Sequence, residues 1–282
     1  MSVQLIALLT NIGLALMKFT VGSVAGSRAL IADAFNSAGD VVATFVAWVA
    51  FRYGMKPADA DHHYGHQNAE ALAGLLLGGM LCATGAFICI DGILSLAHVD
   101  QPEPPRSIAM SAAGLTALIK AVLYHFSMKV GKRTNSPTLL ASARDHGADV
   151  ISGLVALGGI WVATHGFPRF DAIAGTLIGV YIFYLGFNPV QSNTAILMHK
   201  APPELAGSAA KVATQVEGIA EVRQVRVQPI GGSYRMDMIV LVDGGITVEQ
   251  AHRIAHAAED EILKTMTNVT EVHMHVEPVG NA

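Results

Sequence analysis

The sequence predicts an α-helical membrane protein in which six transmembrane helices precede a small α+β domain of element order αββαβ. The chain of 282 residues is 52% hydrophobic and only 14% charged, with a mean hydropathy of +0.44. This is too apolar for a soluble domain of that size. Apolar residues are dense up to Met198, and charged residues become frequent after it. We therefore expect a six-helix transmembrane domain over residues 1–198 and a soluble domain over residues 199–282.

Six apolar segments are long enough for a membrane span, which takes about 20 residues. In chain order they cover residues 3–24, 29–52, 69–97, 107–129, 138–164 and 171–190. Glycine, proline and charged residues mark the ends of these segments, as in "KPADADHHYGHQ" after the second. The first segment has no positively charged start and no small-residue cleavage site, so we interpret it as a retained helix and not a signal peptide.

The basic residues beside the spans predict the orientation of the chain. An even number of spans places both termini on one side of the membrane. The side of the termini carries Arg52, Lys56, Lys129, Lys132, Arg133 and Lys200, and the other side carries Arg28, Arg106 and Arg169. Because lysine and arginine favour the cytoplasmic side, we expect both termini in the cytoplasm and the spans in the inner or plasma membrane.

The soluble segment alternates between helix and strand patterns. Residues 202–218 and 247–266 have helical spacing, and residues 221–230, 233–243 and 270–278 alternate like strands. Gly231 and Gly232 separate the first two strands, which is a hairpin signal. We expect two helices on one face of a three-stranded sheet, whose free edges favour pairing with a second copy.

Polar residues inside the second and fifth spans indicate a binding site. Asn36 and Asp40 are four residues apart, as are Asp145 and Asp149. Each pair therefore projects from one helix face. A carboxylate at mid-membrane costs about 2.5 kcal/mol or more, so such groups usually have a partner or a function. Two facing helices would present four oxygen-bearing side chains to one point, where a divalent cation would balance the charge.

The alternative is an intramembrane hydrogen-bond network in which Lys18 and Lys120 act as counter-ions, with Arg144 as a further basic neighbour. Interhelical polar contacts more often use Ser, Thr, Asn or Gln than several aspartates, and ionisable residues in spans usually mark transport paths. Asp33 precedes Asn36 by three residues. The sequence offers it no evident partner, and a position at the helix end explains it as well as ligation does.

Other features exclude competing classes of function. The net charge is −4 and no lysine or arginine run is present, so no nucleic-acid partner is expected. No nucleophile–base set, HExxH motif or phosphate loop appears, so we expect neither an enzyme nor a bound cofactor. Cys82 and Cys89 lie seven residues apart on one helix face and are interpreted as small packing residues, in preference to a disulfide or a soft-metal site.

With these residues in place, the chain resembles the cation diffusion facilitator family of divalent metal exporters. The resemblance covers essentially the whole length: six spans, the two polar pairs, the loop "DADHHYGHQNAE" and a ferredoxin-like cytoplasmic domain. It implies a transport site of Asn36, Asp40, Asp145 and Asp149. Zinc-transporting relatives usually carry a histidine in this quartet, and the set here is similar to that of manganese exporters. Hard oxygen ligands independently suit Mn²⁺.

Several histidines lie near this site or outside it. His146 follows Asp145 and should point about 100° away around the helix, so we interpret it as a packing residue or as a residue behind the ligands. The resemblance implies an accessory metal site at Asp59, His62 and His66. These residues have ligand spacing if the segment is helical, but the glycine in "HHYGH" is equally consistent with a solvated turn.

The resemblance also implies a regulatory metal site in the soluble domain. His273, His275 and Glu277 alternate on the last strand, and with His252 they could bind metal at a dimer interface. Where relatives carry further histidines, this chain offers Asp237 and apolar residues, so ordinary surface histidines are the competing interpretation.

The resemblance includes one departure from the family pattern. Some relatives join a lysine at the start of the third span to an aspartate after the sixth. The corresponding residues here are Asn68 and His199, so no ionic lock is expected.

The sequence thus predicts a homodimeric exporter in the lipid bilayer that moves a divalent cation out of the cytoplasm. Mn²⁺ is favoured as the transported ion, and protons are the counter-substrate that the resemblance implies. A zinc (Zn²⁺) or iron (Fe²⁺) exporter is the alternative within the same class. An intramembrane metalloenzyme and a non-transporting metal sensor are the alternatives from other classes.

Overall fold

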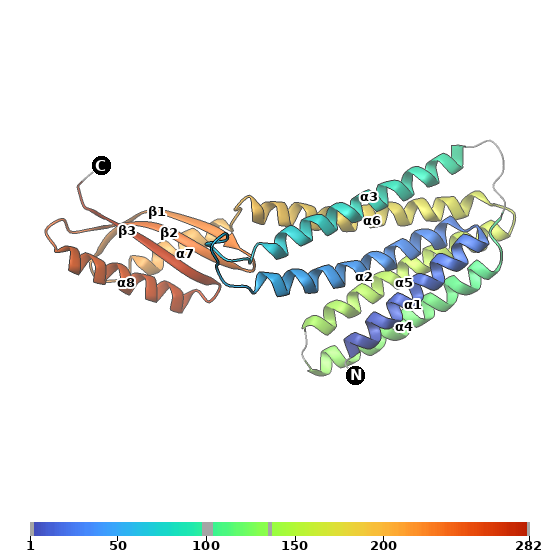
Figure 1. The fold of residues 1–282 in the computed structure, drawn as a ribbon, viewed down its shortest axis with the longest axis horizontal. Coiled ribbons are helices and arrows are strands. Elements are labelled where there is room, and N and C mark those ends of the chain that lie inside the picture. Colours follow the sequence, from blue (N-terminus) through green and yellow to red (C-terminus); the bar gives the residue numbers. More distant parts are fainter. Residues whose placement is uncertain (1–2, 98–103, 135–136, 281–282) are drawn as a thin grey trace. The chain divides into compact units, whose positions relative to one another are not determined.

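Six long helices form the first part of the protein. The computed structural model describes residues 3–97, 104–134 and 137–280. In chain order the helices are α1 (Val3–Ala25), α2 (Arg28–Gly54), α3 (Ala69–Ala97), α4 (Ile108–Thr134), α5 (Pro137–Thr164) and α6 (Arg169–Leu197) (Figure 1). All six are long and apolar enough to cross a membrane, which confirms the predicted spans.

Two of the predicted ends were wrong. Helix α4 continues to Thr134 and α6 to Leu197, beyond the expected residues 129 and 190. Hydropathy marks where a helix leaves the apolar layer, whereas backbone hydrogen bonds decide where it stops. After α6 the chain turns at His199 (φ 60°), with His199 N–H donating to Ile196 O and Lys200 N–H to Ala195 O. This is the hydrogen-bond pattern of a Schellman cap, which satisfies the last carbonyl groups of the helix.

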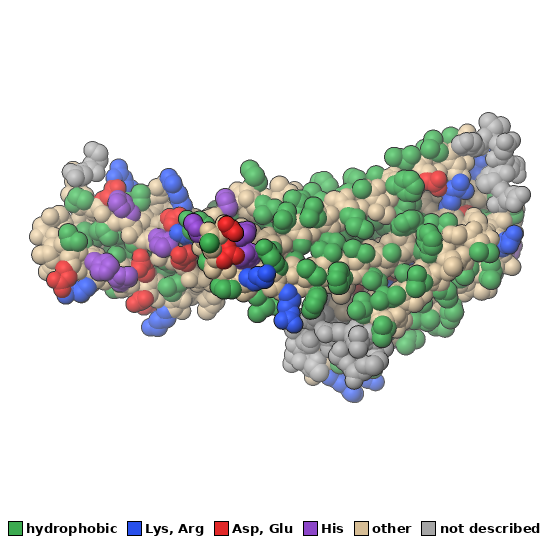
Figure 2. Space-filling view, in the orientation of Figure 1, with side chains coloured by type: hydrophobic (Ala, Val, Ile, Leu, Met, Phe, Trp, Pro, Cys, Tyr) green, Lys and Arg blue, Asp and Glu red, His purple; other side chains and the backbone are tan. Residues whose placement is uncertain are grey.

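The surface of the helices is apolar. Large hydrophobic side chains such as Leu16, Phe87 and Leu118 are more than half exposed. Figure 2 shows hydrophobic side chains over the visible face of the helical part, while charged and histidine side chains gather over the sheet and its helices. An exposed apolar surface of this kind is favourable in contact with lipid and unfavourable in contact with water.

Helices α3 and α6 pack through glycines. Gly78 and Gly85 on α3 and Gly179 and Gly186 on α6 are each seven residues apart, and the backbones meet at these positions. A Cβ atom on Gly85 would lie 2.5 Å from the backbone nitrogen of Phe183. Small residues allow such close approach of membrane helices.

Both cysteines lie on the same face of α3. They are free, and their thiols point to carbonyl groups of α6: Cys82 Sγ lies 3.6 Å from Phe183 O, and Cys89 Sγ lies 3.6 Å from Thr176 O. This arrangement agrees with their interpretation as small packing residues.

The chain divides into two compact units, one of residues 1–46 and 76–190 and one of residues 47–75 and 191–282. The second unit contains the elements α7 (Pro203–Ala213), β1 (Ile219–Ile230), β2 (Ser233–Val242), α8 (Val248–Thr265) and β3 (Val269–Pro278). The sheet order is β1-β2-β3, with β1 antiparallel and β3 parallel to β2. The predicted αββαβ order is therefore confirmed.

Gly231 and Gly232 form the predicted two-residue hairpin loop between Ile230 and Ser233, with Gly231 at φ 59°. One core joins both helices to one face of the sheet. Met236 and Met238 on β2 are at most 1% exposed, and they belong to the same cluster as Ala209 and Ala213 of α7 and Ile262 of α8. Both helices therefore cover the same face, as predicted.

Candidate functional site

The four predicted site residues line one cavity in the helical unit. Helix α2 contributes Asn36 and Asp40, helix α5 contributes Asp145 and Asp149, and the cavity measures about 350 Å³. Asn36 and Asp149 are 4% and 5% exposed, and Asn36 Nδ2 donates to Asp149 Oδ1 over 2.9 Å. Asp145 is exposed and Asp40 is half-buried. The i,i+4 spacing on each helix thus brings three carboxylates and a carboxamide to one cavity.

A buried lysine accompanies this cavity. Lys120 of α4, 1% exposed, forms an ion pair with Asp149 Oδ2. The hydrogen bond from Asn36 satisfies the other oxygen of the same carboxylate. The counter-ion contact that the alternative interpretation assigned to Lys120 is therefore present in the structure, whereas Arg144 is exposed.

The second buried lysine has a different partner. Lys18 of α1 pairs with Asp33 Oδ2 over 2.6 Å and donates to Ser37 Oγ over 3.0 Å. Ser152 of α5 donates to Asp33 Oδ1 over 2.7 Å. No partner for Asp33 was evident from the sequence, and in the structure the residue is fully buried inside the bundle. Its partners come from α1 and α5, and only helix packing brings them to it.

His146 lines the same cavity as the quartet, and it is 3% exposed. The predicted offset of about 100° from Asp145 does not remove it from the cavity. His146 is also three residues before Asp149 and four after Ser142, so all these residues share one broad face of α5. Its Nε2 lies 3.5 Å from Ser142 Oγ, and within the described residues no group hydrogen-bonds to its Nδ1.

Further cavity residues were missed from the sequence, among them Asn11 of α1 and Tyr181 of α6. Asn11 Oδ1 is buried and has no hydrogen-bond partner among the described residues. An isolated asparagine in the first apolar segment was the available signal, because an amide inside a span requires a partner.

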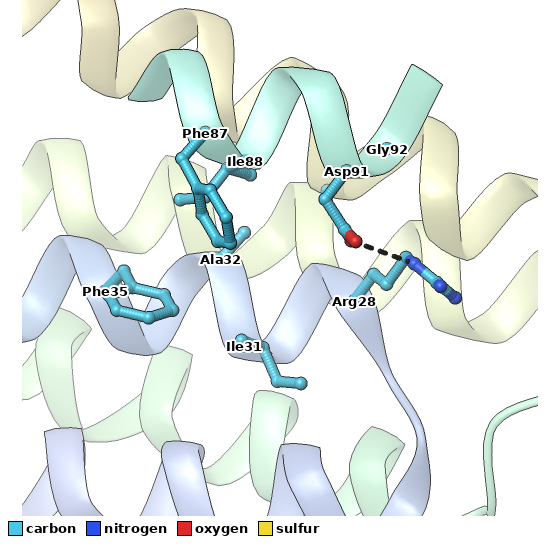
Figure 3. A pocket seen from close by; sticks show the side chains of 9 residues that line it. Arg28, Ile31, Ala32, Phe35, Phe87, Ile88, Asp91 and Gly92 are labelled. Atoms are coloured by element: carbon cyan, nitrogen blue, oxygen red, sulfur yellow. Dashed lines mark hydrogen bonds and ion pairs between the residues drawn. The ribbon is translucent and has the colours of Figure 1, made fainter. Parts of the chain in front are cut away.

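A smaller cavity of about 60 Å³ lies between α2 and α3, near the start of α2. Arg28 Nε contacts Asp91 Oδ2 over 3.0 Å (Figure 3). Beside it, buried Asp171 of α6 accepts hydrogen bonds from Ser27 Oγ and the Arg28 backbone N–H, both 2.6 Å. These bonds satisfy donors at the start of α2 and join it to α3 and α6.

In the second unit, the loop after α2 brings Asp59, His62 and His66 together. One ligand atom from each lies within 4.8 Å of the others. Asp59 Oδ2 is 3.3 Å from His66 Nε2, and Asp59 Oδ1 is 3.2 Å from His62 Nδ1. The segment forms a turn with Gly65 at φ 78°, and not the helix that was the other possibility. The three ligand atoms converge even without a helix.

Hydrogen bonds preorganise this loop. The backbone N–H of His62 donates to Asp59 over 2.7 Å and that of Asp61 over 3.0 Å, and these bonds lower the pKa of the exposed Asp59 carboxyl. His66 Nδ1 faces Pro57 O at 3.2 Å. A proton on Nδ1 would leave Nε2 free toward Asp59, which is how metal-binding histidines are commonly oriented. Among the described residues, the three aspartates of the quartet do not bring their carboxylate oxygens within 4.8 Å of one another.

The histidines of the soluble domain do not form one cluster. His273 and His275 line a cavity with Asp237 on the sheet face away from the helices. His252 of α8 lines another cavity together with Glu277. Within one chain, the four residues predicted for this site therefore line two cavities. Residues 273, 275 and 277 share one face of β3, and His275 Nε2 lies 3.6 Å from Glu277 Oε1.

Glu277 already has a partner, since its Oε2 accepts a hydrogen bond from Arg223 Nη1 over 2.7 Å. Asn68 and His199 likewise have other partners within the second unit. Asn68 Oδ1 accepts from Gly231 N–H over 3.2 Å, and His199 contacts Gln228.

Six apolar helices and a cavity lined by three aspartates are typical of a membrane protein that handles cations. Two family models match the chain, the cation efflux transmembrane domain over residues 4–198 and the cation efflux protein cytoplasmic domain over residues 201–279. The chain belongs to the cation efflux family. It is a multi-pass membrane transporter of divalent metal cations and not an enzyme.

Three relatives illustrate the range of this family. The chain is 33% identical to the manganese efflux system protein MneP of Bacillus subtilis, covering 98% of this chain and 95% of the relative. It is 31% identical to metal tolerance protein C1 of Arabidopsis thaliana, covering 97% of this chain and 61% of the plant protein. It is 25% identical to magnetosome protein MamB of Magnetospirillum gryphiswaldense, covering 98% and 93%.

Proposed function

We propose that the protein exports Mn²⁺ from the cytoplasm in exchange for protons, with Asn36, Asp40, Asp145 and Asp149 as the transport site. The observation that carries this proposal is the single cavity that all four side chains line. Three carboxylates and a carboxamide supply hard oxygen ligands, which suit Mn²⁺. The relative MneP, described as a manganese efflux protein, supports the same ion.

Proton exchange follows from the chemistry of these ligands. A carboxylate that loses its metal in a site of low dielectric gains affinity for a proton. Metal would bind from the cytoplasmic side and leave when the helices rock to the other side. Protonation of the emptied carboxylates would then lower the cost of carrying them back through the membrane.

The remaining parts of the proposal concern organisation. We propose a transport domain over residues 1–198 and a dimerising domain over residues 199–282, with both termini in the cytoplasm and the helices in the inner or plasma membrane. Asp59, His62 and His66 would form an accessory metal site, supported by their convergence within 4.8 Å. A metal site that uses His252, His273, His275 and Glu277 would require a second copy, because these residues line separate cavities in one chain.

A zinc or iron exporter is the second candidate, and His146 favours zinc. This histidine is buried at the cavity, and its Nδ1 has no hydrogen-bond partner among the described residues. Imidazole nitrogen raises affinity for zinc relative to manganese. If His146 is a ligand, His146→Ala should reduce zinc transport strongly and manganese transport little.

Metal uptake into proteoliposomes tests the proposal. Vesicles that contain the full chain would receive Mn²⁺, Zn²⁺ or Fe²⁺ under an imposed pH gradient, with internal pH recorded alongside metal. Mn²⁺ should be taken up fastest and should move protons the opposite way. Asp40→Ala or Asp149→Ala should lower uptake at least tenfold, whereas Asp91→Asn, which lies outside the cavity, should preserve it. Near-normal uptake by either alanine variant would refute the site, and uptake without proton movement would refute the exchange.

A further inference from the structure

Two buried ion pairs, one with its carboxylate on α2 and one with its carboxylate on α5, have the same composition. In one, Asp33 of α2 is held by Ser152 of α5 and by Lys18 of α1. In the other, Asp149 of α5 is held by Asn36 of α2 and by Lys120 of α4. Each consists of a carboxylate, a neutral donor from the facing helix and a lysine from a third helix. Because Asp33 and Asn36 are three residues apart, as are Asp149 and Ser152, the two pairs are neighbours along the helices.

The two pairs differ in what surrounds them. Lys18 and Asp33 are at most 1% exposed and do not line the cavity of the quartet. Asp149 lines that cavity together with Asp40 and Asp145. The first pair is therefore a closed contact, and the second shares its carboxylate with the proposed metal site.

The two ion pairs also differ in the net charge of their surroundings. Lys18 neutralises Asp33, so that pair adds no net charge to the bundle. The three quartet carboxylates carry three negative charges, and Lys120 reduces the total to two. One divalent cation then balances the site. A metal ion that binds Asp149 must also compete with the ammonium group for the same oxygens.

We infer that Lys120 is a tethered counter-cation of the transport site, holding Asp149 while no metal is bound and leaving it when the divalent cation enters. Its four-carbon stem allows the ammonium group to move without any backbone shift. Lys120 is thus a positioning residue that limits metal affinity and speeds release, because its return to Asp149 displaces the ion. The inference rests on the proposed function.

Mn²⁺ binding to the purified full chain tests this role by calorimetry at a mildly alkaline pH. Lys120→Met should bind Mn²⁺ at least about tenfold more tightly, since the competing charge is gone. In proteoliposomes the same variant should have a lower KM and a lower kcat. Lys120→Arg keeps the charge and should bind as the wild type does. Lys18→Met is the matched control: it also leaves a buried carboxylate without its lysine, but it should not change the affinity.

The outcomes separate this inference from the proposed function. A merely structural role for Lys120 would weaken metal binding in Lys120→Met and would not tighten it, so unchanged or weaker binding overturns the inference. Should the methionine variant fail to fold, Lys120→Gln retains a donor for Asp149 without the charge and should show the same tightening. Asp40→Asn should weaken Mn²⁺ binding whatever Lys120 does. If it does not, the proposed site itself is wrong.

Discussion

The packing of α3 against α6 predicts that Gly85→Ala destabilises the protein. A Cβ atom at this position would lie 2.5 Å from the backbone nitrogen of Phe183 and 2.7 Å from the carbonyl oxygen of Gly179. Ordinary contacts begin near 3.4 Å, so the helices would have to separate by about 0.9 Å, the difference between 3.4 and 2.5 Å. Both contacts are with backbone atoms, which no rotamer change can relieve.

Overpacking of this kind costs about 1–3 kcal/mol. Alanine also favours the helix over glycine by about 1 kcal/mol, which would partly hide the clash. Gly79→Ala provides the control, because nothing lies within 4 Å of its added Cβ atom. The propensity gain is common to both variants, so the difference between them isolates the clash.

Thermal unfolding of both variants in detergent measures this difference. Gly85→Ala should unfold at a lower temperature than Gly79→Ala, by about 2–4 °C for each kcal/mol. Its transport should also fall, because α6 contributes Tyr181 to the cavity. Equal unfolding temperatures for the two variants would refute the close backbone approach of α3 and α6.

Other expectations concern the sites and the soluble domain. Asp145→His should raise zinc uptake relative to manganese several-fold, because it adds imidazole nitrogen and removes a charge; an unchanged metal ratio would mean that the quartet does not set selectivity. A chain ending at Lys200 should keep some metal binding but dimerise less well, which light scattering in detergent checks. Thr247→Ala removes the capping box of α8 and should cost about 1 kcal/mol in thermal unfolding of the soluble domain. Hydrogen bonds lower the pKa of the Asp59 carboxyl, so the stability from its ionised form should be complete above the usual aspartate pKa of about 4 and should be lost as pH falls through the lower folded value. Amide exchange at His62 should speed up only as pH falls through that lower value. The Asp59→Ala variant should lose this pH dependence.

The histidines and the loop show where sequence reasoning stopped. The spacing of His62 and His66 was compatible with either a helix or a turn. The structure shows a turn, and this turn places both histidines beside Asp59. For His146, the 100° offset from Asp145 did not show that the residue lines the same cavity, because the width of a cavity determines how much of a helix face reaches it. The width of the cavity depends on the distance between the helices, and the periodicity of a single helix gives no information about that distance.

By itself the sequence determined the six spans and the αββαβ order, and it indicated four polar residues that line one cavity in the structure. Hydropathy, strand alternation, the Gly231–Gly232 turn and i,i+4 spacing are local properties, so a short window of residues is enough to recognise them. Tertiary structure alone decided which lysine neutralises which aspartate. Lys18 and Lys120 were equal candidates in the sequence, yet one pairs with Asp33 and the other with Asp149. These partners come from different helices, and the rotation and closeness of those helices depend on packing across the whole bundle.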